Sequence, residues 1–587
     1  MLLGSMFQDQ MVFQRAPHSP MIWGYGTPGK EIRVEVIDAN GVNVTKSTES
    51  VFVKKNEEFE INLGSFEPGS GYNIIVREVL NKNQSLTVEL LDVAFGDVWI
   101  CTGQSNMMWR VKDIRDGEAE IAKAVGYEDI RLLKTAREFS DHPLLEPKAF
   151  ENNWSKPHKD FLANGDSFSG FCLIFGEQLY DQLNIPIGLI ESSWGATRIE
   201  TWSPPDSLAS CEIKDTGAGK RPENHHEYLW NGMIHPYLRF SIKGVIWYQG
   251  EQNAGYPDSN YVGHNRELYF CTFPKLIDNW RKHWARKTNG DVDRKFPFGF
   301  MQLGPFTDQR ENFAWPELRW QQTAGYGFAP NDVLENVFMA TAIDSDIQLH
   351  PTNKRLPATR LSWAALNLVY GNISAPIRGP HPMKVSFKAT DRKKIMIIYD
   401  QEIAKVPKEA DRFMICCSES LEDCDKTTYG YGWQGVDIVG NIGKKSLELD
   451  TSSSSCPSNY SGIAYLWLET PCSAETACPV YSNDEYRLPA LPWRQEVKQS
   501  SCVMEVAYTG DHIKIVQTGE MFLITADQED CHRACLVHPE CEYYAWYDAM
   551  SLTYPGKCFL QKNKKIKMKE NFLQFGSKTC HTRDGNV

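Results

Sequence analysis

The pattern of apolar and polar residues changes several times along the chain. From residue 1 to about 92, short segments such as "IRVEVID" and "SLTVELLDV" alternate apolar and polar residues between clusters of Gly, Pro and Asn. Alternation with a period of two places successive side chains on opposite faces of a strand. Residues 1–92 are therefore predicted to form a small N-terminal β-domain.

From about 93 to 375 the pattern alternates short apolar runs with longer amphipathic segments. The longer segments, which predict helices, cover residues 170–184, 261–284 and 353–371. The apolar runs are "DVWIC", "IGLIESS", "GVIWYQG", "FPFGFMQLG" and "NVFMATAID". Such alternation is typical of an α/β domain, in which helices cover both faces of a parallel sheet.

Strand-like segments return after about residue 375. Residues 376–490, with "KKIMIIYD" and "GIAYLWLE", are predicted to form a C-terminal β-domain. The segment 488–501, "LPALPWRQEVKQSS", is rich in Pro and Ser and predicts a linker. Residues 500–587 then form a separate compact module.

Cysteine usage indicates an oxidising compartment. Twelve of the 16 cysteines follow residue 415 in two groups of six, each within 90 residues, as disulfide frameworks do. Zinc would need tight cysteine pairs or nearby histidines, which these spacings lack. The groups are 416, 417, 424, 456, 472 and 478, then 502, 531, 535, 541, 558 and 580; glycosylation sequons lie at Asn43, Asn83, Asn153, Asn372 and Asn459. We expect a secreted or lysosomal protein, although "MLLGSMFQDQ" does not resemble a signal peptide.

Composition disfavours several classes of partner. A net charge of −13 and a pI near 5.6 argue against nucleic acid and anionic membrane surfaces. No apolar run reaches the roughly 18 residues of a membrane span. No cluster of residues suggests a metal or another cofactor, so none is expected.

Residues that suit acyl transfer follow successive strands of the α/β segment. Such chemistry needs a nucleophile, a base and donors to the oxyanion, and parallel strands bring their carboxyl ends to one edge. Ser105 follows the first strand, although a serine there can also simply cap a helix. The later strands are followed by Gly195, by Gln249, Glu251 and Asn253, and by Asp344, Asp346 and His350.

Motifs in this order resemble a known family. "CTGQSNM", "GLIESSWGAT", "VIWYQGEQN" and "HPTNK" are similar to those of the sialate O-acetylesterases, members of the SGNH-hydrolase superfamily. The resemblance covers residues 5 to 490 and implies an SGNH-type parallel sheet flanked by helices. The end of the chain, with "DCHRACLVHPECEYYAWYD", resembles the PAN/apple module, which implies the disulfides Cys502–Cys580, Cys531–Cys558 and Cys535–Cys541.

The resemblance also implies catalytic roles. Ser105 matches the nucleophile and His350 the general base, while the N–H groups of Ser105 and Gly195 and the Gln249 side chain match the oxyanion donors. Many relatives carry Asp two or three residues before the histidine, where this chain has Gln348 and Ile347. Asp346 is preferred as the acidic residue of a triad, with Asp344 or a Ser–His dyad as alternatives.

The residues around these motifs have two interpretations each. Arg198 can bind the carboxylate of a sialic acid or pair with Glu200. Glu251 can contact substrate or support the Ser105 loop, and Cys101 is expected to be a buried thiol. The candidate substrate-binding residues are Gln104, Asn106, Trp194, Arg198, Glu251 and Asn253.

The sequence therefore predicts a serine esterase that removes O-acetyl groups from sialic acids or sialoglycans. Two alternatives stay open: an esterase with broader specificity for acetylated carbohydrates, and a catalytically silent protein that binds glycans or proteins. The apple-like module is expected to bind a glycan or protein ligand of its own.

Overall fold

The structure is a computed structural model of the chain. Up to residue 496 it describes all residues except 47–49, 166, 215–220, 256–264, 307–313, 389–390, 408–411, 427–431 and 457–459. Beyond residue 496 it describes only the backbone of the strands β23 (Val503–Thr509), β24 (His512–Thr518), β25 (Leu523–Ile524), β26 (Tyr543–Tyr547), β27 (Lys557–Gln561) and β28 (Leu573–Ser577). The three disulfides predicted for the apple-like module, and the sequon at Asn459, lie outside what the structure describes.

A twisted sheet forms the middle of the molecule. Its strand order is β10, β9, β11, β8, β12, β13, β14, and all neighbours pair in parallel except β10 with β9. The strands are β10 (Phe150–Ser155), β9 (Ile130–Thr135), β11 (Ile187–Ser193), β8 (Gln84–Gly103), β12 (Gly244–Tyr248), β13 (Phe298–Gln302) and β14 (Val337–Thr341). The predicted mixed α/β class is confirmed, whereas the SGNH-type assignment stays a prediction.

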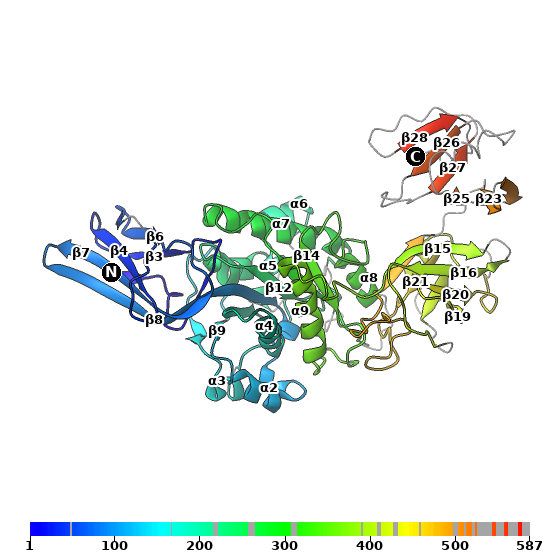
Figure 1. Cartoon of the computed structure of the whole chain (residues 1–587). Coiled ribbons are helices and arrows are strands. Elements are labelled where there is room, and N and C mark those ends of the chain that lie inside the picture. The colour runs from blue at the N-terminus through cyan, green and yellow to red at the C-terminus, as the bar shows by residue number, and fades with distance from the viewer. Residues whose placement is uncertain are drawn as a thin grey trace.

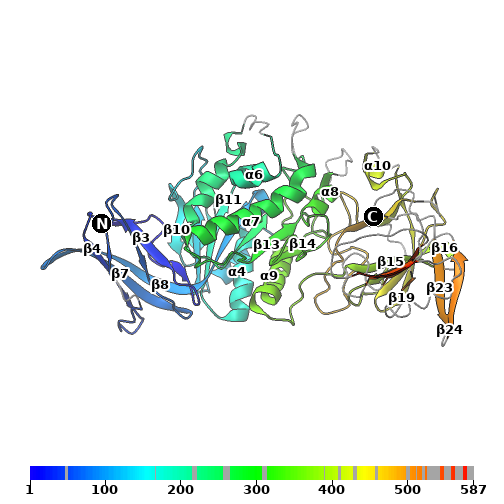
Figure 2. The same cartoon turned by 90° about the horizontal axis from the view of Figure 1, so that it is seen from above.

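Helices cover both faces of this sheet, as Figures 1 and 2 show. The helices α4 (Gly170–Leu183) and α9 (Arg355–Tyr370) pack together on one face, and α6 (Pro205–Ser210) and α7 (Tyr269–Lys287) lie on the other. The three long helices confirm the three predicted helical segments. The shorter helices are α1 (Ser105–Met108), α2 (Gly117–Ala124), α3 (Lys159–Ala163), α5 (Ile199–Trp202), α8 (Ala314–Gln321) and α10 (Leu421–Lys426).

The long strand β8 joins the N-terminal β-domain to the central sheet. Its first part pairs with β7, and its last residues pair with β11 and β12. One continuous backbone therefore runs from the N-terminal domain to the residue before Gln104. The other N-terminal strands are β1 (Leu2–Leu3), β2 (Val12–Gln14), β3 (Met21–Tyr25), β4 (Glu31–Ile37), β5 (Val51–Phe52), β6 (Glu58–Asn62) and β7 (Gly69–Asn81).

The C-terminal β-domain consists of two four-stranded sheets. One has the order β15 (Pro382–Lys388), β16 (Asp391–Tyr399), β20 (Ser446–Asp450), β19 (Asp437–Gly443), and the other β18 (Trp433–Gly435), β17 (Phe413–Cys416), β21 (Gly462–Tyr465), β22 (Trp493–Glu496). Strand β22 falls inside the predicted linker 488–501. That prediction is wrong for this part, because Trp493 is buried and β22 pairs with β21.

Five disulfides lie in the described residues. The first cysteine group pairs within itself, as Cys416–Cys424, Cys417–Cys456 and Cys472–Cys478, which confirms the predicted framework. The expectation of a free thiol at Cys101 is wrong, because Cys101 bonds Cys172 and so ties β8 to α4; Cys211 bonds Cys271.

The sequon residues Asn43, Asn83, Asn153 and Asn372 are all exposed. Among the described helices, none combines the length and the apolar character that crossing a bilayer requires.

Candidate active site

Strand β8 ends in a glycine that no other residue can replace without a backbone shift. Gly103 has φ +132°, and a Cβ atom built there would lie 2.2 Å from the Tyr248 carbonyl oxygen. The Gln104 N–H donates to that same carbonyl at 2.9 Å. Helix α1 begins at the next residue, Ser105, which is half-buried. The close contact with β12 thus fixes the backbone from which helix α1 and Ser105 begin.

The turn after β11 lies against Ser105. The Trp194 N–H donates to the Gly103 carbonyl at 3.0 Å. A Cβ atom built on Gly195 would lie 3.3 Å from the Ser105 Cβ, so the glycine leaves room beside that side chain. Neither the Ser105 nor the Gly195 N–H donates a hydrogen bond to any described residue. Two unused backbone donors therefore lie beside the Ser105 hydroxyl.

The loop after β14 brings His350 against helix α1. The Asn106 Nδ2 atom donates to the Leu349 carbonyl at 2.8 Å. The Trp109 ring stacks on the His350 imidazole, with ring centroids 4.4 Å apart and planes 17° from parallel. Asn106 and Trp109 thus contact Leu349 and His350. The segment that begins at Ser105 and the segment that contains His350 therefore lie against each other.

The His350 side chain is half-buried. Burial, helped by the positive charge of Lys354, lowers the pKa of His350 to about 4. Its Nε2 atom is buried and has no hydrogen-bond partner among the described residues, Ser105 included. Hydrogen bonds between catalytic groups often tighten only when substrate binds. A neutral imidazole with an unused nitrogen can accept a proton.

A polar network lies beneath helix α1. The Asn106 amide donates to the Glu251 carboxylate and accepts from the Lys354 ammonium, and all three side chains are buried. Burial raises the pKa of Glu251 and lowers the pKa of Lys354 to about 7. Glu251 thus supports the Ser105 segment, and Lys354 of the "HPTNK" motif joins the same network. No role for Lys354 was predicted from the sequence.

Gln249 and Asn253 lie behind the turn that contains Gly195. The Gln249 Nε2 atom donates to the Thr197 carbonyl at 3.0 Å and to Asn253 Oδ1 at 2.7 Å, and Gln249 Oε1 accepts from the Tyr269 hydroxyl. Both amide hydrogens of Gln249 are therefore engaged in hydrogen bonds that stabilise this turn. Asn253 in turn donates to Glu200 at 3.0 Å.

The other candidate substrate-binding residues differ in exposure. Arg198 is only 1% exposed, and its guanidinium donates to the Asn224 carbonyl. Gln104 is buried, and its side-chain oxygen accepts from the Gln252 N–H at 3.2 Å. Trp194 is half-buried beside Phe139. Of these three residues, only Trp194 offers surface to a ligand in this structure.

The two candidate acidic residues bind partners other than His350. The Asp346 carboxylate accepts from the Thr352 hydroxyl at 2.9 Å and from Arg115 Nη2 at 2.8 Å. Asp344 is fully buried and receives two hydrogen bonds from Arg360. Among the described residues, neither aspartate is hydrogen-bonded to the His350 ring in this structure, and the role predicted for Asp346 stays a prediction.

A residue from the C-terminal β-domain reaches this segment. Glu475 lies between the bonded cysteines Cys472 and Cys478, and its carboxylate accepts from Arg115 Nη1 at 2.8 Å. Glu475 also accepts from Asn353. No motif pointed to Glu475, because it is more than 120 residues from His350 in the sequence.

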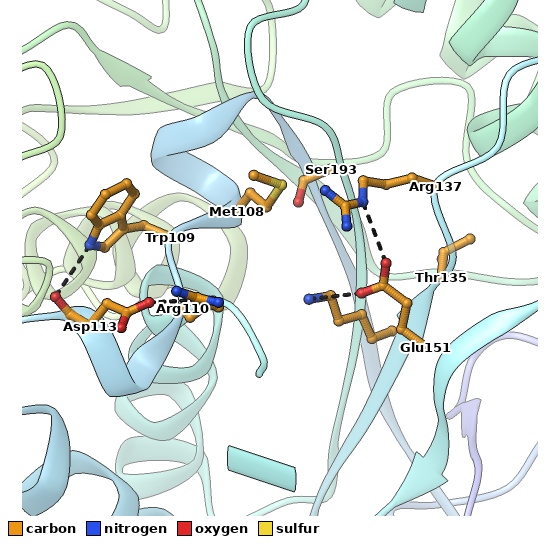
Figure 3. A pocket seen from close by; sticks show the side chains of 9 residues that line it. Met108, Trp109, Arg110, Asp113, Thr135, Arg137, Glu151 and Ser193 are labelled. Atoms are coloured by element: carbon orange, nitrogen blue, oxygen red, sulfur yellow. Dashed lines mark hydrogen bonds and ion pairs between the residues drawn. The ribbon is translucent and has the colours of Figure 1, made fainter. Parts of the chain in front are cut away.

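A cavity of about 410 Å³ opens beside helix α1 (Figure 3). Its volume is in the range of small-molecule sites. Met108 and Trp109 line one side, and Arg137 and Glu151, near strands β9 and β10, line the other. The cavity is also lined by Arg110, Asp113, Lys134, Thr135 and Ser193. Within the described ranges, no three His, Cys, Asp or Glu side chains gather as metal ligands.

The chain is similar to known proteins over most of its length. The chain is 34% identical over 504 residues to the sialate O-acetylesterase of Homo sapiens, covering 83% of this chain and 91% of that protein. The chain belongs to the sialate O-acetylesterase family. The Mus musculus sialate O-acetylesterase is 33% identical over 533 residues, covering 84% of this chain and 94% of that protein.

Two family models match separate parts of the chain. Residues 95–322 match "carbohydrate esterase, sialic acid-specific acetylesterase", and residues 384–497 match the sialate O-acetylesterase C-terminal domain. The crystal structure of a carbohydrate acetylesterase from Xanthomonas citri is similar, with a TM-score of 0.66, 25% identity and coverage of 84% of this chain and 99% of that one. As a member of the sialate O-acetylesterase family, the chain is a carboxylic ester hydrolase.

Proposed function

We propose that this esterase hydrolyses O-acetyl esters of sialic acids through an acetyl-enzyme on Ser105. The observation that carries the proposal is that helix α1, which begins at Ser105, holds the segment of His350 through the Asn106–Leu349 hydrogen bond and the Trp109 stack. Nucleophile and base thus lie on segments that directly contact each other. The names of the relatives supply the substrate class.

In the proposed reaction, His350 takes the proton of the Ser105 hydroxyl as its oxygen attacks the acetyl carbonyl carbon. The N–H groups of Ser105 and Gly195 stabilise the oxyanion, and Gln249 becomes a third donor only by giving up a present hydrogen bond. The bond from acyl carbon to sugar oxygen breaks, and His350 returns the proton to that oxygen. Water then releases acetate by the reverse proton transfers.

The orientation of His350 follows from packing in this proposal. The Trp109 ring and the Asn106 bridge hold the imidazole, while Asp346 acts through Thr352 and Arg115 as a positioning residue. The mechanism is thus closer to a Ser–His dyad than to a triad with Asp346. Asp346→Asn is expected to lower kcat less than about tenfold, because the polar contact with Thr352 is retained.

The experiment that tests the proposal combines labelling with a substrate panel. A fluorophosphonate probe, which requires an activated serine, is expected to modify the full chain at Ser105, as located by peptide mass spectrometry. The same protein is expected to release acetate from O-acetyl sialic acids. Absence of labelling at Ser105, or of acetate release from every O-acetyl isomer, contradicts the proposal.

A broader specificity for acetylated carbohydrates is the second candidate function, favoured by the structural similarity to the Xanthomonas citri carbohydrate acetylesterase. Acetylated xylan distinguishes the two candidates. Comparable kcat/KM on acetylated xylan and on O-acetyl sialic acid would support the broader activity.

The low pKa of His350 predicts activity at acidic pH. A general base works only when it is deprotonated, so kcat/KM is expected to stay high down to about pH 5 and to fall as pH drops through about 4. The measurement is kcat/KM for 4-nitrophenyl acetate from pH 3.5 to 8. Lys354→Met removes a charge that lowers the pKa of His350, so the acidic limb should move to higher pH. An acidic limb near pH 6.5 in the wild type contradicts this prediction.

A further inference from the structure

The segment 344–353, the His350 segment, is contacted by the C-terminal β-domain, which lies beside the central domain in Figure 1. The Thr476 N–H donates to the Asp344 carbonyl at 2.9 Å. The Tyr481 hydroxyl donates to the Asp344 carboxylate at 2.9 Å. Because Asp344 is fully buried, these two hydrogen bonds tie the first residue of the segment to the C-terminal domain.

Glu475 of the same domain reaches further along the His350 segment. Its carboxylate accepts from Asn353 and from Arg115 Nη1, which lies 2.8 Å from one oxygen and 3.0 Å from the other. Arg115 in turn donates from Nη2 to Asp346 at 2.8 Å and from its backbone N–H to the Thr352 carbonyl at 2.9 Å. Residues before and after the histidine are thus bound to Glu475, directly or through Arg115.

The loop that carries Glu475 is held at both ends and within its span. Cys472 and Cys478 are buried and bonded to each other. Between them, Thr476 has φ +54°, a left-handed conformation that is unfavourable for a β-branched residue and persists only where surrounding contacts impose it. The hydrogen bond from Thr476 to Asp344 is one such contact. The Glu475 carboxylate therefore projects from a backbone whose position is well determined.

Exposure of the side chains separates positioning from stability. The Glu475 and Arg115 side chains are 27% and 43% exposed, so water screens their ion pair and the pair stabilises the fold little. The Asp346 side chain, which Arg115 also binds, is only 10% exposed. Loss of the Glu475 carboxylate should therefore loosen Arg115 and the His350 segment without unfolding the protein.

We propose that Glu475 is a positioning residue for the base, because through Arg115 it holds His350 where it can take the proton of Ser105. The inference rests on the proposed function, in which His350 is that base. It makes the C-terminal β-domain part of the catalytic unit, since a residue of that domain sets the geometry between two residues of the central domain. A displacement of about 1 Å in such geometry can lower a rate about 100-fold.

The test measures kcat for 4-nitrophenyl acetate and the rate of fluorophosphonate labelling at Ser105 in the full chain. In Glu475→Ala both are expected to fall about tenfold, whereas KM should change less than about threefold. The described lining of the cavity beside helix α1 does not include Glu475, which is why KM should change little. Glu475→Gln, which keeps one oxygen as an acceptor, should retain an intermediate kcat. The urea midpoint of both variants should stay close to that of the wild type.

Glu402→Ala is the matched control. Glu402 is an exposed glutamate of the same domain, and its carboxylate pairs with Lys444. Its loss removes a comparable surface ion pair that does not contact the His350 segment. The kcat and the labelling rate of this variant should equal those of the wild type.

A double-mutant cycle tests whether Glu475 acts through Arg115. Arg115→Met should lower kcat at least as much as Glu475→Ala, because it also removes the bond to Asp346. The double variant should have nearly the kcat of Arg115→Met alone, since the two substitutions remove the same contact.

The inference is overturned if Glu475→Ala keeps more than half of the wild-type kcat and labelling rate, or if its effect is confined to KM. Should that variant not fold, an unchanged kcat in Glu475→Gln has the same meaning. Effects that multiply in the double variant also overturn it, because Glu475 then does not act through Arg115. In all these cases the wild type is still labelled at Ser105. A wild type without labelling at Ser105 contradicts the proposed function instead.

Discussion

Replacement of Ser105 by alanine is expected to lower kcat for O-acetyl sialic acid and for 4-nitrophenyl acetate by about 10³-fold or more. The variant keeps the two backbone N–H groups but loses the oxygen that forms the acetyl-enzyme. Ser105 is half-buried at the start of α1, and no hydrogen bond of its hydroxyl to a described residue supports the fold. The thermal unfolding midpoint should therefore stay close to that of the wild type. Acetate release and fluorophosphonate labelling are the measurements.

Ser362→Ala is a matched control for this variant. Ser362 is a buried serine of helix α9 whose hydroxyl donates to the Thr359 carbonyl of the same helix at 2.7 Å. Its loss should leave kcat and labelling unchanged. If Ser105→Ala retains more than a tenth of the wild-type kcat, Ser105 is not the nucleophile, and the mechanism fails even though the chain is an ester hydrolase.

Much of the central domain could be predicted because its strands are buried on both faces. Segments such as Gly244–Tyr248 and Val337–Thr341 are short and almost wholly apolar, so their pattern predicts a buried strand without knowledge of the neighbouring strands. Strand β9 was missed because it carries Arg131 and Lys134. Both are buried, and Lys134 finds its partners in Ser167 and Glu151, which are remote in the sequence. The sequence of β9 alone therefore looks like an exposed segment.

The site was predictable in position but not in orientation. The ends of parallel strands must lie at one edge, so Ser105, Gly195 and the residues after β12 were expected together. Which atoms are available to a substrate depends instead on the hydrogen-bond partners of each side chain. Gln249 donates both amide hydrogens to other residues, Thr197 and Asn253, rather than toward Ser105. Contributions from remote segments, such as Glu475 of the C-terminal domain, leave no local pattern at all.

Asn106→Ala is expected to lower both the stability of the protein and kcat. The Asn106 side chain binds two buried ionisable groups and also holds the segment that contains His350. In the folded protein its amide satisfies Glu251 and Lys354, which are both buried. Removal leaves two ionisable groups without this partner, at a cost of about 3 kcal/mol in the free energy of unfolding. The lost bond to the Leu349 carbonyl also frees the segment that holds His350. We therefore expect kcat to fall about 100-fold, with a smaller change in KM for 4-nitrophenyl acetate.

The comparison with Asn279→Ala separates positioning from general loss of stability. Asn279 is a buried asparagine of helix α7, and its amide donates to the Ser207 hydroxyl at 3.0 Å on the face of the sheet opposite α4 and α9. Its loss should cost about 1 kcal/mol and leave kcat unchanged. Urea unfolding gives the stabilities, and kcat is measured at a temperature at which every variant is folded. Equal kcat in the two variants would mean that the Asn106 bridge stabilises the fold without positioning His350, because only one of the two asparagines contacts the histidine segment.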